Sequence, residues 1–142
     1  MKAHFLGHVV FYVEDIDNSL KFYHELIGFN IVGSFKKPFY AVALSSGRTH
    51  HELLLIEVGS APKPPTGHRL GLYHIGIKVG DSLEELTDVK RELIDLGILI
   101  SGMSDHTVSQ SIYISDPDGN EVELYVDDPN IDWKNEPNLV MS

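Results

Sequence analysis

Residues 111–125 read SIYISDPDGNEVELY and have the pattern of two strands joined by a turn. Apolar and polar residues alternate on both sides of Asp-Pro-Asp-Gly, whose residue types favour a tight turn. Because side chains alternate between the two faces of a strand, the second strand has an apolar face made of Val122, Leu124 and Val126. Its other face carries Glu121, Glu123 and Tyr125. The sequence therefore predicts two carboxylates that point away from the core.

An internal repeat places a histidine at the same position in both halves of the chain. Val13, Asp15 and Leu20 lie five, seven and twelve residues after His8, and Val79, Asp81 and Leu86 lie at the same distances after His74. Each histidine belongs to an alternating segment, 5–13 or 72–79, which we interpret as a strand. A duplication of this kind predicts a pseudo-twofold arrangement in which His8 and His74 approach each other.

Each half has the pattern of a βαβββ module. The first module covers about 5–58, with strands at 5–13, 29–35, 39–45 and 50–58, and its helix stripe is Ile16, Leu20, Tyr23 and Ile27. The second covers about 71–126, with strands at 72–79, 98–100, 108–115 and 120–126, and its helix begins at a capping box formed by Ser82 and Glu85. Residues 59–70 contain three prolines and form a linker. We expect one α+β domain over 1–126, with two βαβββ modules forming a curved mixed sheet, and a tail over 127–142 anchored by Trp133.

Composition limits the chemistry and the partners. The 142 residues include no cysteine, so histidine and carboxylate must carry any metal chemistry, and a reducing cytoplasm is the compartment we expect. The formal charge of −10 disfavours nucleic acid and anionic membranes as partners, because both bind clustered Lys and Arg. From the N-terminal residues we expect no signal peptide, and from the hydropathy pattern no membrane span.

Two histidines and one carboxylate on strands are the minimum for holding a divalent metal while leaving other positions open for substrate. Each residue alone is more often structural or solvated. Histidine at one register in both repeats, followed by a carboxylate on the last strand, is hard to explain as coincidence. The combination favours a metal site.

Paired βαβββ units, a histidine on the first strand of each, and a closing DPDGNEVEL resemble the vicinal oxygen chelate superfamily over about 8–128. That superfamily includes glyoxalase I, extradiol ring-cleaving dioxygenases, methylmalonyl-CoA epimerase and the fosfomycin and bleomycin resistance proteins. The resemblance implies the glyoxalase/bleomycin resistance/dihydroxybiphenyl dioxygenase fold, the metal ligands His8, His74 and Glu123, and a homodimer. It leaves open whether one chain or two build each site.

Three segments resemble the extradiol dioxygenase branch: RTHHEL at 48–53, DHTVSQSIY at 105–113 and ELYVDDP at 123–129. The resemblance implies that His51 is the acid-base group, that Tyr113 donates a hydrogen bond to a substrate oxygen and that His106 contacts substrate. It also implies a catechol-type aromatic and O2 as substrates and favours Fe(II), with Mn, Zn and Ni left open. By alternation, Leu53 and Leu55 would share the face of His51 and form an apolar wall for the ring.

Other interpretations compete with this one. Many extradiol dioxygenases carry two such domains, whereas this chain has one, as glyoxalase I does. A glyoxalase I-like lyase or isomerase would use Zn or Ni and a fourth protein ligand, for which Glu57 shares the predicted face of His51 while Glu52 faces the other way. A non-catalytic drug-binding protein of the bleomycin-resistance kind would lack the metal residues, and this chain has all three. Without a catalytic role, His51 would be an exposed strand end, Tyr113 a core residue and His106 a turn cap.

Overall fold

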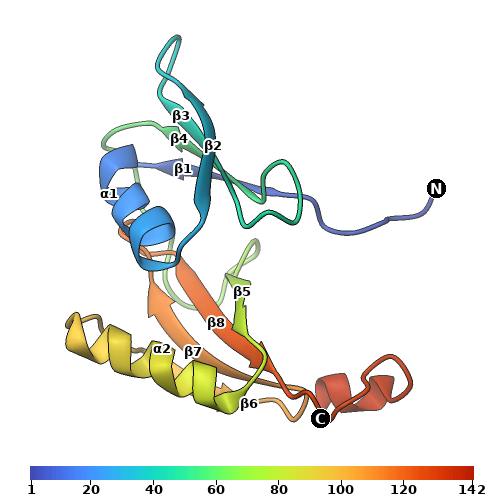
Figure 1. The fold of residues 1–142 in the computed structure, drawn as a ribbon. Coiled ribbons are helices and arrows are strands. Elements are labelled where there is room, and N and C mark those ends of the chain that lie inside the picture. The colour runs from blue at the N-terminus through green and yellow to red at the C-terminus, as the bar shows by residue number, and fades with distance from the viewer. The chain divides into compact units, whose positions relative to one another are not determined.

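The computed structural model describes residues 1–142, which form two compact units, Met1–Pro64 and Pro65–Ser142. The division falls inside the proline-rich stretch 59–70. Each unit contains a strand, a helical segment and three further strands, in that order (Figure 1). The predicted α+β fold with two βαβββ modules is confirmed.

The first unit has a four-stranded sheet with the order β1-β4-β3-β2. Its elements are β1 (Val9–Val13), α1 (Ile16–Leu20), η1 (Lys21–Leu26), β2 (Asn30–Phe35), β3 (Ala41–Ser45) and β4 (Leu53–Glu57). Strand β1 runs parallel to β4, and the other neighbours are antiparallel. The sheet is therefore mixed, and its parallel pair brings the first and last strands of the module together.

The second unit repeats this topology in the order β5-β8-β7-β6, with β5 parallel to β8. Its elements are β5 (His74–Gly80), α2 (Leu83–Asp95), β6 (Gly102–Asp105), β7 (Ser109–Ser115) and β8 (Glu121–Asp127), and η2 (Pro137–Met141) follows in the tail. The sequence repeat is thus also a repeat of strand order and direction.

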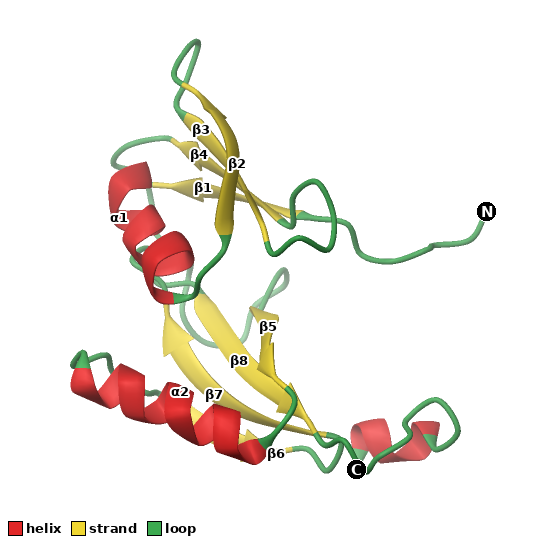
Figure 2. Cartoon of the chain, viewed as in Figure 1, coloured by secondary structure: helices red, strands yellow, loops and turns green.

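The core of the second unit lies between α2 and one face of its sheet (Figure 2). Leu86 and Leu93 of the helix are each 2% exposed, and the β8 residues Val122, Leu124 and Val126 are buried as the alternation predicts. Burying an aliphatic side chain of this size contributes about 1.5–3 kcal/mol. Ser82 caps the helix by accepting a hydrogen bond from the Glu85 backbone N–H, and the Glu85 carboxylate accepts one from the Asp81 backbone.

The first helix differs from the predicted single stripe. It begins at the N-cap Asp15 as an α-helix and continues as a wider π-helical turn over Lys21–Leu26. Phe22 in the wider turn is buried together with Ile16 and Tyr23, while Leu20, just before this turn, is only half-buried. The helix ends at Gly28 in the left-handed region, with φ 98°.

The turn between β7 and β8 is built around Asp116, which is 5% exposed. Its Oδ1 accepts hydrogen bonds from the backbone N–H groups of Asp118 at 2.9 Å and Asn120 at 2.8 Å. Gly119 adopts φ 91°, a conformation that favours glycine. The predicted tight turn is confirmed, and it sets the register of β8 against β7.

Four expectations about local structure are wrong. Strand β1 covers only Val9–Val13, so His8 lies just before the strand and not within it. Residues 98–100 are not a strand, because the Ile98 N–H still bonds to the helical Leu93 carbonyl and β6 begins only at Gly102. Strand β4 begins at Leu53, after His50 and His51. Trp133 is 54% exposed and lies beneath the Lys134 ammonium group, so it does not anchor the tail.

No helix of the chain combines the length and apolar character that crossing a bilayer requires.

Candidate functional site

The second sheet carries a row of polar side chains on the face opposite α2. Glu123 lies between Gly76 on one side and Tyr113 on the other, and His74 lies opposite Glu121. Residues directly opposite each other in neighbouring strands point to the same side of a sheet. Since Val122 and Leu124 point into the core, these polar residues all point away from it.

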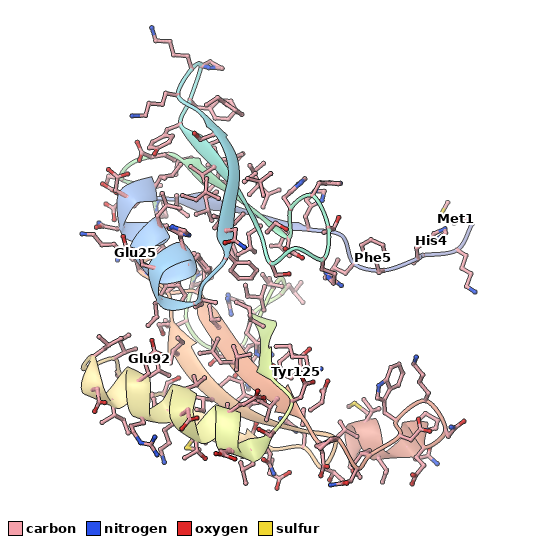
Figure 3. All side chains as sticks on the ribbon, in the orientation of Figure 1. Met1, His4, Phe5, Glu25, Glu92 and Tyr125 are labelled. Carbon is pink, nitrogen blue, oxygen red and sulfur yellow. The ribbon has the colours of Figure 1, made fainter.

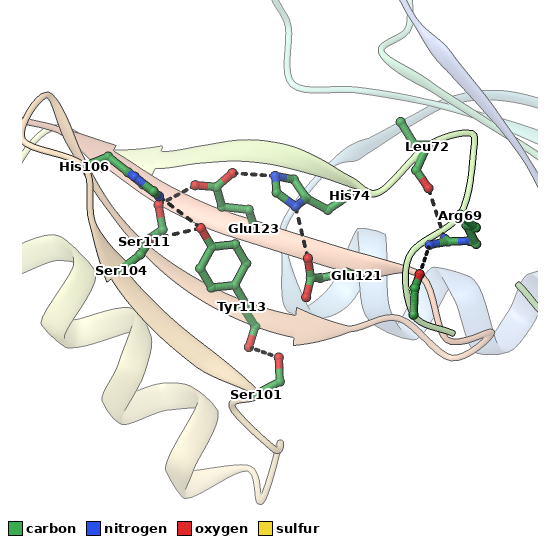
Figure 4. Close-up of polar contacts among 11 residues, drawn as sticks. Arg69, Leu72, His74, Ser101, Ser104, His106, Ser111, Tyr113, Glu121 and Glu123 are labelled. Atoms are coloured by element: carbon green, nitrogen blue, oxygen red, sulfur yellow. Dashed lines mark hydrogen bonds and ion pairs between the residues drawn. The ribbon is translucent and has the colours of Figure 1, made fainter. Parts of the chain in front are cut away.

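His74 is the first residue of β5 and interacts through both ring nitrogens (Figure 4). Its Nδ1 lies 3.0 Å from Oε2 of Glu121, and its Nε2 lies 3.1 Å from Oε2 of Glu123. The side chain of Glu123 is 16% exposed, whereas those of His74 and Glu121 are 31% and 29% exposed. Two of the three predicted metal ligands, His74 and Glu123, are therefore neighbours on one sheet face.

The second oxygen of Glu123 is held by a buried hydroxyl. Ser111 is 1% exposed, and its Oγ donates a hydrogen bond of 2.5 Å to Oε1 of Glu123. With one oxygen on Ser111 and the other toward His74, the carboxylate has a fixed orientation.

Tyr113 and His106 lie on the same face and contact each other. The Tyr113 hydroxyl is 2.9 Å from Ser104 Oγ and 3.4 Å from His106 Nε2, and its ring centroid is 5.7 Å from that of His74 (Figure 4). His106 stands in the tight turn between β6 and β7, where Thr107 adopts φ 68°. Four predicted site residues, His74, His106, Tyr113 and Glu123, are thus close together in the second unit.

The first unit gathers three histidines where β1 and β4 begin. The rings of His8 and His51 have centroids 4.5 Å apart, as do those of His50 and His51, and the Nδ1 atoms of His50 and His51 are 2.5 Å apart. Desolvation, followed by the nearby charges of His8 and His50, lowers the pKa of His51, and Glu52 opposes this shift. The structure therefore brings the predicted acid-base residue next to the predicted ligand His8.

Glu52 stabilises the turn between β3 and β4. Its carboxylate accepts hydrogen bonds from the Ser46 backbone at 2.7 Å and the Ser46 hydroxyl at 2.8 Å, and Arg48 Nε lies 3.6 Å away. Burial alone would raise the pKa of Glu52, but these hydrogen bonds and the Arg48 charge outweigh it and lower the pKa. Arg48 also donates to the Leu6 carbonyl and lies over the Phe5 ring. Figure 3 shows Phe5 on the extended segment before β1.

Glu57 lies on the helix face of its sheet, so its predicted placement beside His51 is wrong. Its Oε2 accepts a hydrogen bond of 2.9 Å from the Ile16 backbone N–H at the start of α1. Leu53 and Leu55 also point into the core, with 3% and 0% exposed, so they do not form the expected wall beside His51. The error arises because His51 precedes β4, and alternation cannot be counted back into a turn.

The repeat shows which residue of the first module corresponds to Glu123. Val9, which follows His8, pairs with Leu53, and Ile75, which follows His74, pairs with Val122. One residue further along, β8 has Glu123 and β4 has Leu54. The first module therefore has leucine at the place where the second has a carboxylate.

Residues 5–124 match the model of the Glyoxalase/Bleomycin resistance protein/Dioxygenase superfamily. The chain belongs to this superfamily. A catechol-2,3-dioxygenase of Bacillus subtilis is 37% identical to the chain over 96% of the chain's residues. The chain spans 47% of the length of that relative. Virulence protein STM3117 of Salmonella typhimurium is 29% identical over 84% of the chain and 81% of its own length.

Solved structures with a similar fold also come from this superfamily. A solved lactoylglutathione lyase from Agrobacterium tumefaciens superposes on 89% of the chain and 96% of its own, with a TM-score of 0.66 and 25% identity. The relatives thus include one named a catechol-2,3-dioxygenase and one named a lactoylglutathione lyase, and the superfamily includes divalent-metal proteins. The site residues must distinguish between these activities.

The pair His74 and Glu123 fits a divalent metal. Two donors in adjacent positions on a metal, each about 2.1 Å from it, lie about 3 Å apart, and the observed Nε2 to Oε2 separation is 3.1 Å. No three His, Cys, Asp or Glu side chains form a group that could hold a metal ion in this structure. The structure thus gives His74 and Glu123 as a pair, and the assignment of His8 as third ligand is a proposal.

Sequence reasoning missed several residues of the site, and alternation could have found Ser111, which precedes Tyr113 by two residues and so shares its face. Alternation did place Glu121 on the face of Glu123, but its contact with His74 depends on the pairing of β5 with β8. His50 was visible beside His51. Nothing in the sequence alone indicates that Ser104 hydrogen-bonds to Tyr113.

Gly76 leaves the space that the Glu123 carboxylate occupies. A Cβ at this position would lie 3.3 Å from Oε2 of Glu123, whereas one at Gly102 would lie 3.7 Å from Tyr113, an ordinary contact. We expect Gly76→Ala to displace the carboxylate and weaken binding of Zn(II) about 10-fold, as other changes that misorient a ligand do. Gly102→Ala is the matched control and should change the affinity by less than about twofold. Calorimetric titration measures both, and equal affinities in the two variants would contradict the role given to Gly76.

Proposed function

We propose that this chain is a metal-dependent extradiol ring-cleaving dioxygenase that acts on a catechol-type aromatic with Fe(II) and O2. The proposed metal ligands are His8, His74 and Glu123. The proposed roles of the remaining residues are acid-base catalysis for His51, hydrogen-bond donation for Tyr113 and substrate contact for His106.

The observation that favours a dioxygenase over an isomerase is the presence of leucine at position 54. It stands where the repeat would place a second carboxylate, and the other two candidates for a fourth ligand are engaged elsewhere: Glu57 with the start of α1 and Glu52 with Ser46. Three protein ligands favour the dioxygenase, because they leave adjacent positions for two reactants. The 37% identity to a catechol-2,3-dioxygenase supports the same choice.

Fe(II), when bound, supplies redox chemistry with O2 and a place to hold both reactants together. In extradiol ring cleavage, the bond that breaks joins one hydroxyl-bearing carbon to the neighbouring ring carbon that bears no hydroxyl. Both oxygen atoms of O2 enter the product. The protein must orient the catechol, remove a phenolic proton and return one as the ring opens.

His51 suits the proton transfers. Its Nδ1 is engaged with His50, so Nε2 is the nitrogen left for substrate. A lowered pKa keeps the imidazole neutral near neutral pH, and a neutral imidazole can accept the phenolic proton. His50 holds the orientation of that ring through the Nδ1 contact.

Tyr113 suits hydrogen bonding to a substrate oxygen. Its hydroxyl can accept from Ser104 or His106, which leaves the phenolic proton to donate. His106 lies on the outer side of this network, in the turn before β7. That position agrees with the substrate contact that we propose for it.

The open face of the first sheet suits an aromatic ring. Val10 and Tyr12 are 46% and 72% exposed, and their partners in β4 are the half-buried Leu54 and Ile56. His8 directly precedes β1, and its ring centroid lies 4.5 Å from that of His51. We propose these four apolar side chains as the wall for the ring, in place of Leu53 and Leu55.

The test is anaerobic reconstitution with Fe(II), followed by air and a panel of catechols. We expect oxygen uptake that requires both Fe(II) and a catechol, together with a yellow ring-cleavage product. No uptake, with tight binding of Zn(II) or Ni(II) and turnover of thiol adducts instead, would overturn the proposal in favour of a lyase or isomerase of the kind named among the solved relatives.

We also propose that residues 1–126 act as one catalytic domain, that the protein is a homodimer and that it works in the cytoplasm. The superfamily resemblance supports the dimer, and the absence of cysteine agrees with a reducing compartment. Sedimentation of the purified chain tests the dimer, since a monomer at micromolar concentration would contradict it.

A further inference from the structure

Glu121 contacts the nitrogen of His74 that the proposed metal does not need. It lies on β8 two residues before Glu123, opposite His74 in β5. Its Oε2 is 3.0 Å from Nδ1, while Nε2 faces Glu123 at 3.1 Å. Each ring nitrogen of His74 therefore has a carboxylate of its own (Figure 4).

The two carboxylates are not equivalent. Glu123 has its other oxygen on the buried Ser111 hydroxyl and is 16% exposed, whereas Glu121 is 29% exposed. A neutral imidazole carries one N–H, and its other nitrogen can bind a metal. If Nε2 and the fixed Glu123 oxygen bind the metal together, the N–H must be on Nδ1, where Glu121 accepts it.

We propose that Glu121 is a positioning residue that fixes His74 with its proton on Nδ1 and leaves Nε2 for the metal. The inference rests on the proposed function, because it takes His74 as a ligand. A carboxylate behind a ligating histidine sets the ring orientation and makes the ligand more basic, and loss of such a partner typically weakens metal affinity 10- to 100-fold.

The first test is titration of the metal-free protein with Zn(II). We expect Glu121→Ala to weaken binding about 10- to 100-fold. Glu121→Gln keeps an oxygen that can accept from Nδ1, so its affinity should lie between those of Glu121→Ala and the unsubstituted protein. Glu92→Gln, on the exposed side of α2, makes the same charge change away from the site and should bind as the unsubstituted protein does. Thermal unfolding of each metal-free variant shows whether folding is affected.

The second test is nitrogen NMR of histidine-labelled protein, which shows directly which ring nitrogen of His74 carries the proton. In the Zn(II)-loaded protein we expect a protonated, slowly exchanging Nδ1 on His74, and we expect Glu121→Ala to lose this protection. Unchanged Zn(II) affinity together with an unchanged Nδ1–H signal in Glu121→Ala would overturn the inference.

Failure of the proposed function can be distinguished from failure of the inference about Glu121. If the unsubstituted protein bound neither Zn(II) nor Fe(II), His74 would not be a metal ligand. The inference about metal affinity would then also be wrong. If it bound both metals but consumed no oxygen with any catechol, the reaction would be wrong, while the variants of Glu121 would still test how His74 is positioned.

Discussion

Replacing His51 with alanine is expected to lower the turnover of a catechol by about 10²- to 10⁴-fold, the contribution of a well-placed acid-base group. The rings of His51 and His8 have centroids 4.5 Å apart. His51 contacts His50 through Nδ1, so its Nε2 is not used in that contact. The loss should fall on turnover at saturating substrate, because His51→Ala retains all three proposed metal ligands. Oxygen uptake measures the rate, and the iron content of the same sample shows that the metal is present.

The control for His51→Ala is the same substitution at an exposed histidine outside the site. His68→Ala, in the linker, should retain full turnover and iron. Turnover in His51→Ala that stays within about twofold of the unsubstituted rate would remove His51 from the mechanism. Loss of iron in His51→Ala would show that His51 acts on His8 rather than on substrate.

The largest effect on metal retention is expected from His74→Ala. This substitution removes one proposed ligand and the ring that lies between the carboxylates of Glu121 and Glu123. A metal at 100 times its dissociation constant stabilises a protein by about 2.7 kcal/mol. Saturating Zn(II) should therefore raise the unfolding temperature of the unsubstituted protein and leave that of His74→Ala unchanged. Metal analysis after desalting gives the second measurement.

His106→Ala is the comparison for His74→Ala, because it removes an imidazole from the same sheet face without removing a proposed ligand. It should retain metal and the shift in unfolding temperature. Undiminished metal in His74→Ala would disprove the assignment of the site to this face of the second sheet.

The fold could be predicted from short-range patterns. Alternation around Val122 and Leu124 identified the buried face of β8, and the matched spacing after His8 and His74 identified two modules that share strand order and direction. Turn chemistry located Asp116 and Gly119 correctly. These features depend on neighbours within a few residues, so a sequence contains enough information to find them.

The site was harder to predict because its details depend on partners distant in sequence. Glu57 lies on the helix face because it caps α1, forty-one residues earlier in the chain. Ser111 is significant only because the register of β7 and β8 brings it to Glu123. The residues named from the family resemblance, His74, His106, Tyr113 and Glu123, do lie together, but the groups that orient them appear only once the strands are paired.

Leu54 and Glu123 hold matching places in two copies of one scaffold, and this pairing bears on how such proteins diverge. Strand order and direction are the same in the two modules, while these two matched positions differ in their capacity to bind a metal. Leucine at this place offers no donor to a metal and adds to the apolar surface formed with Val10 of β1. On the function proposed above, this one side chain therefore bears both on how many protein atoms hold the metal and on which reactant the sheet face accepts.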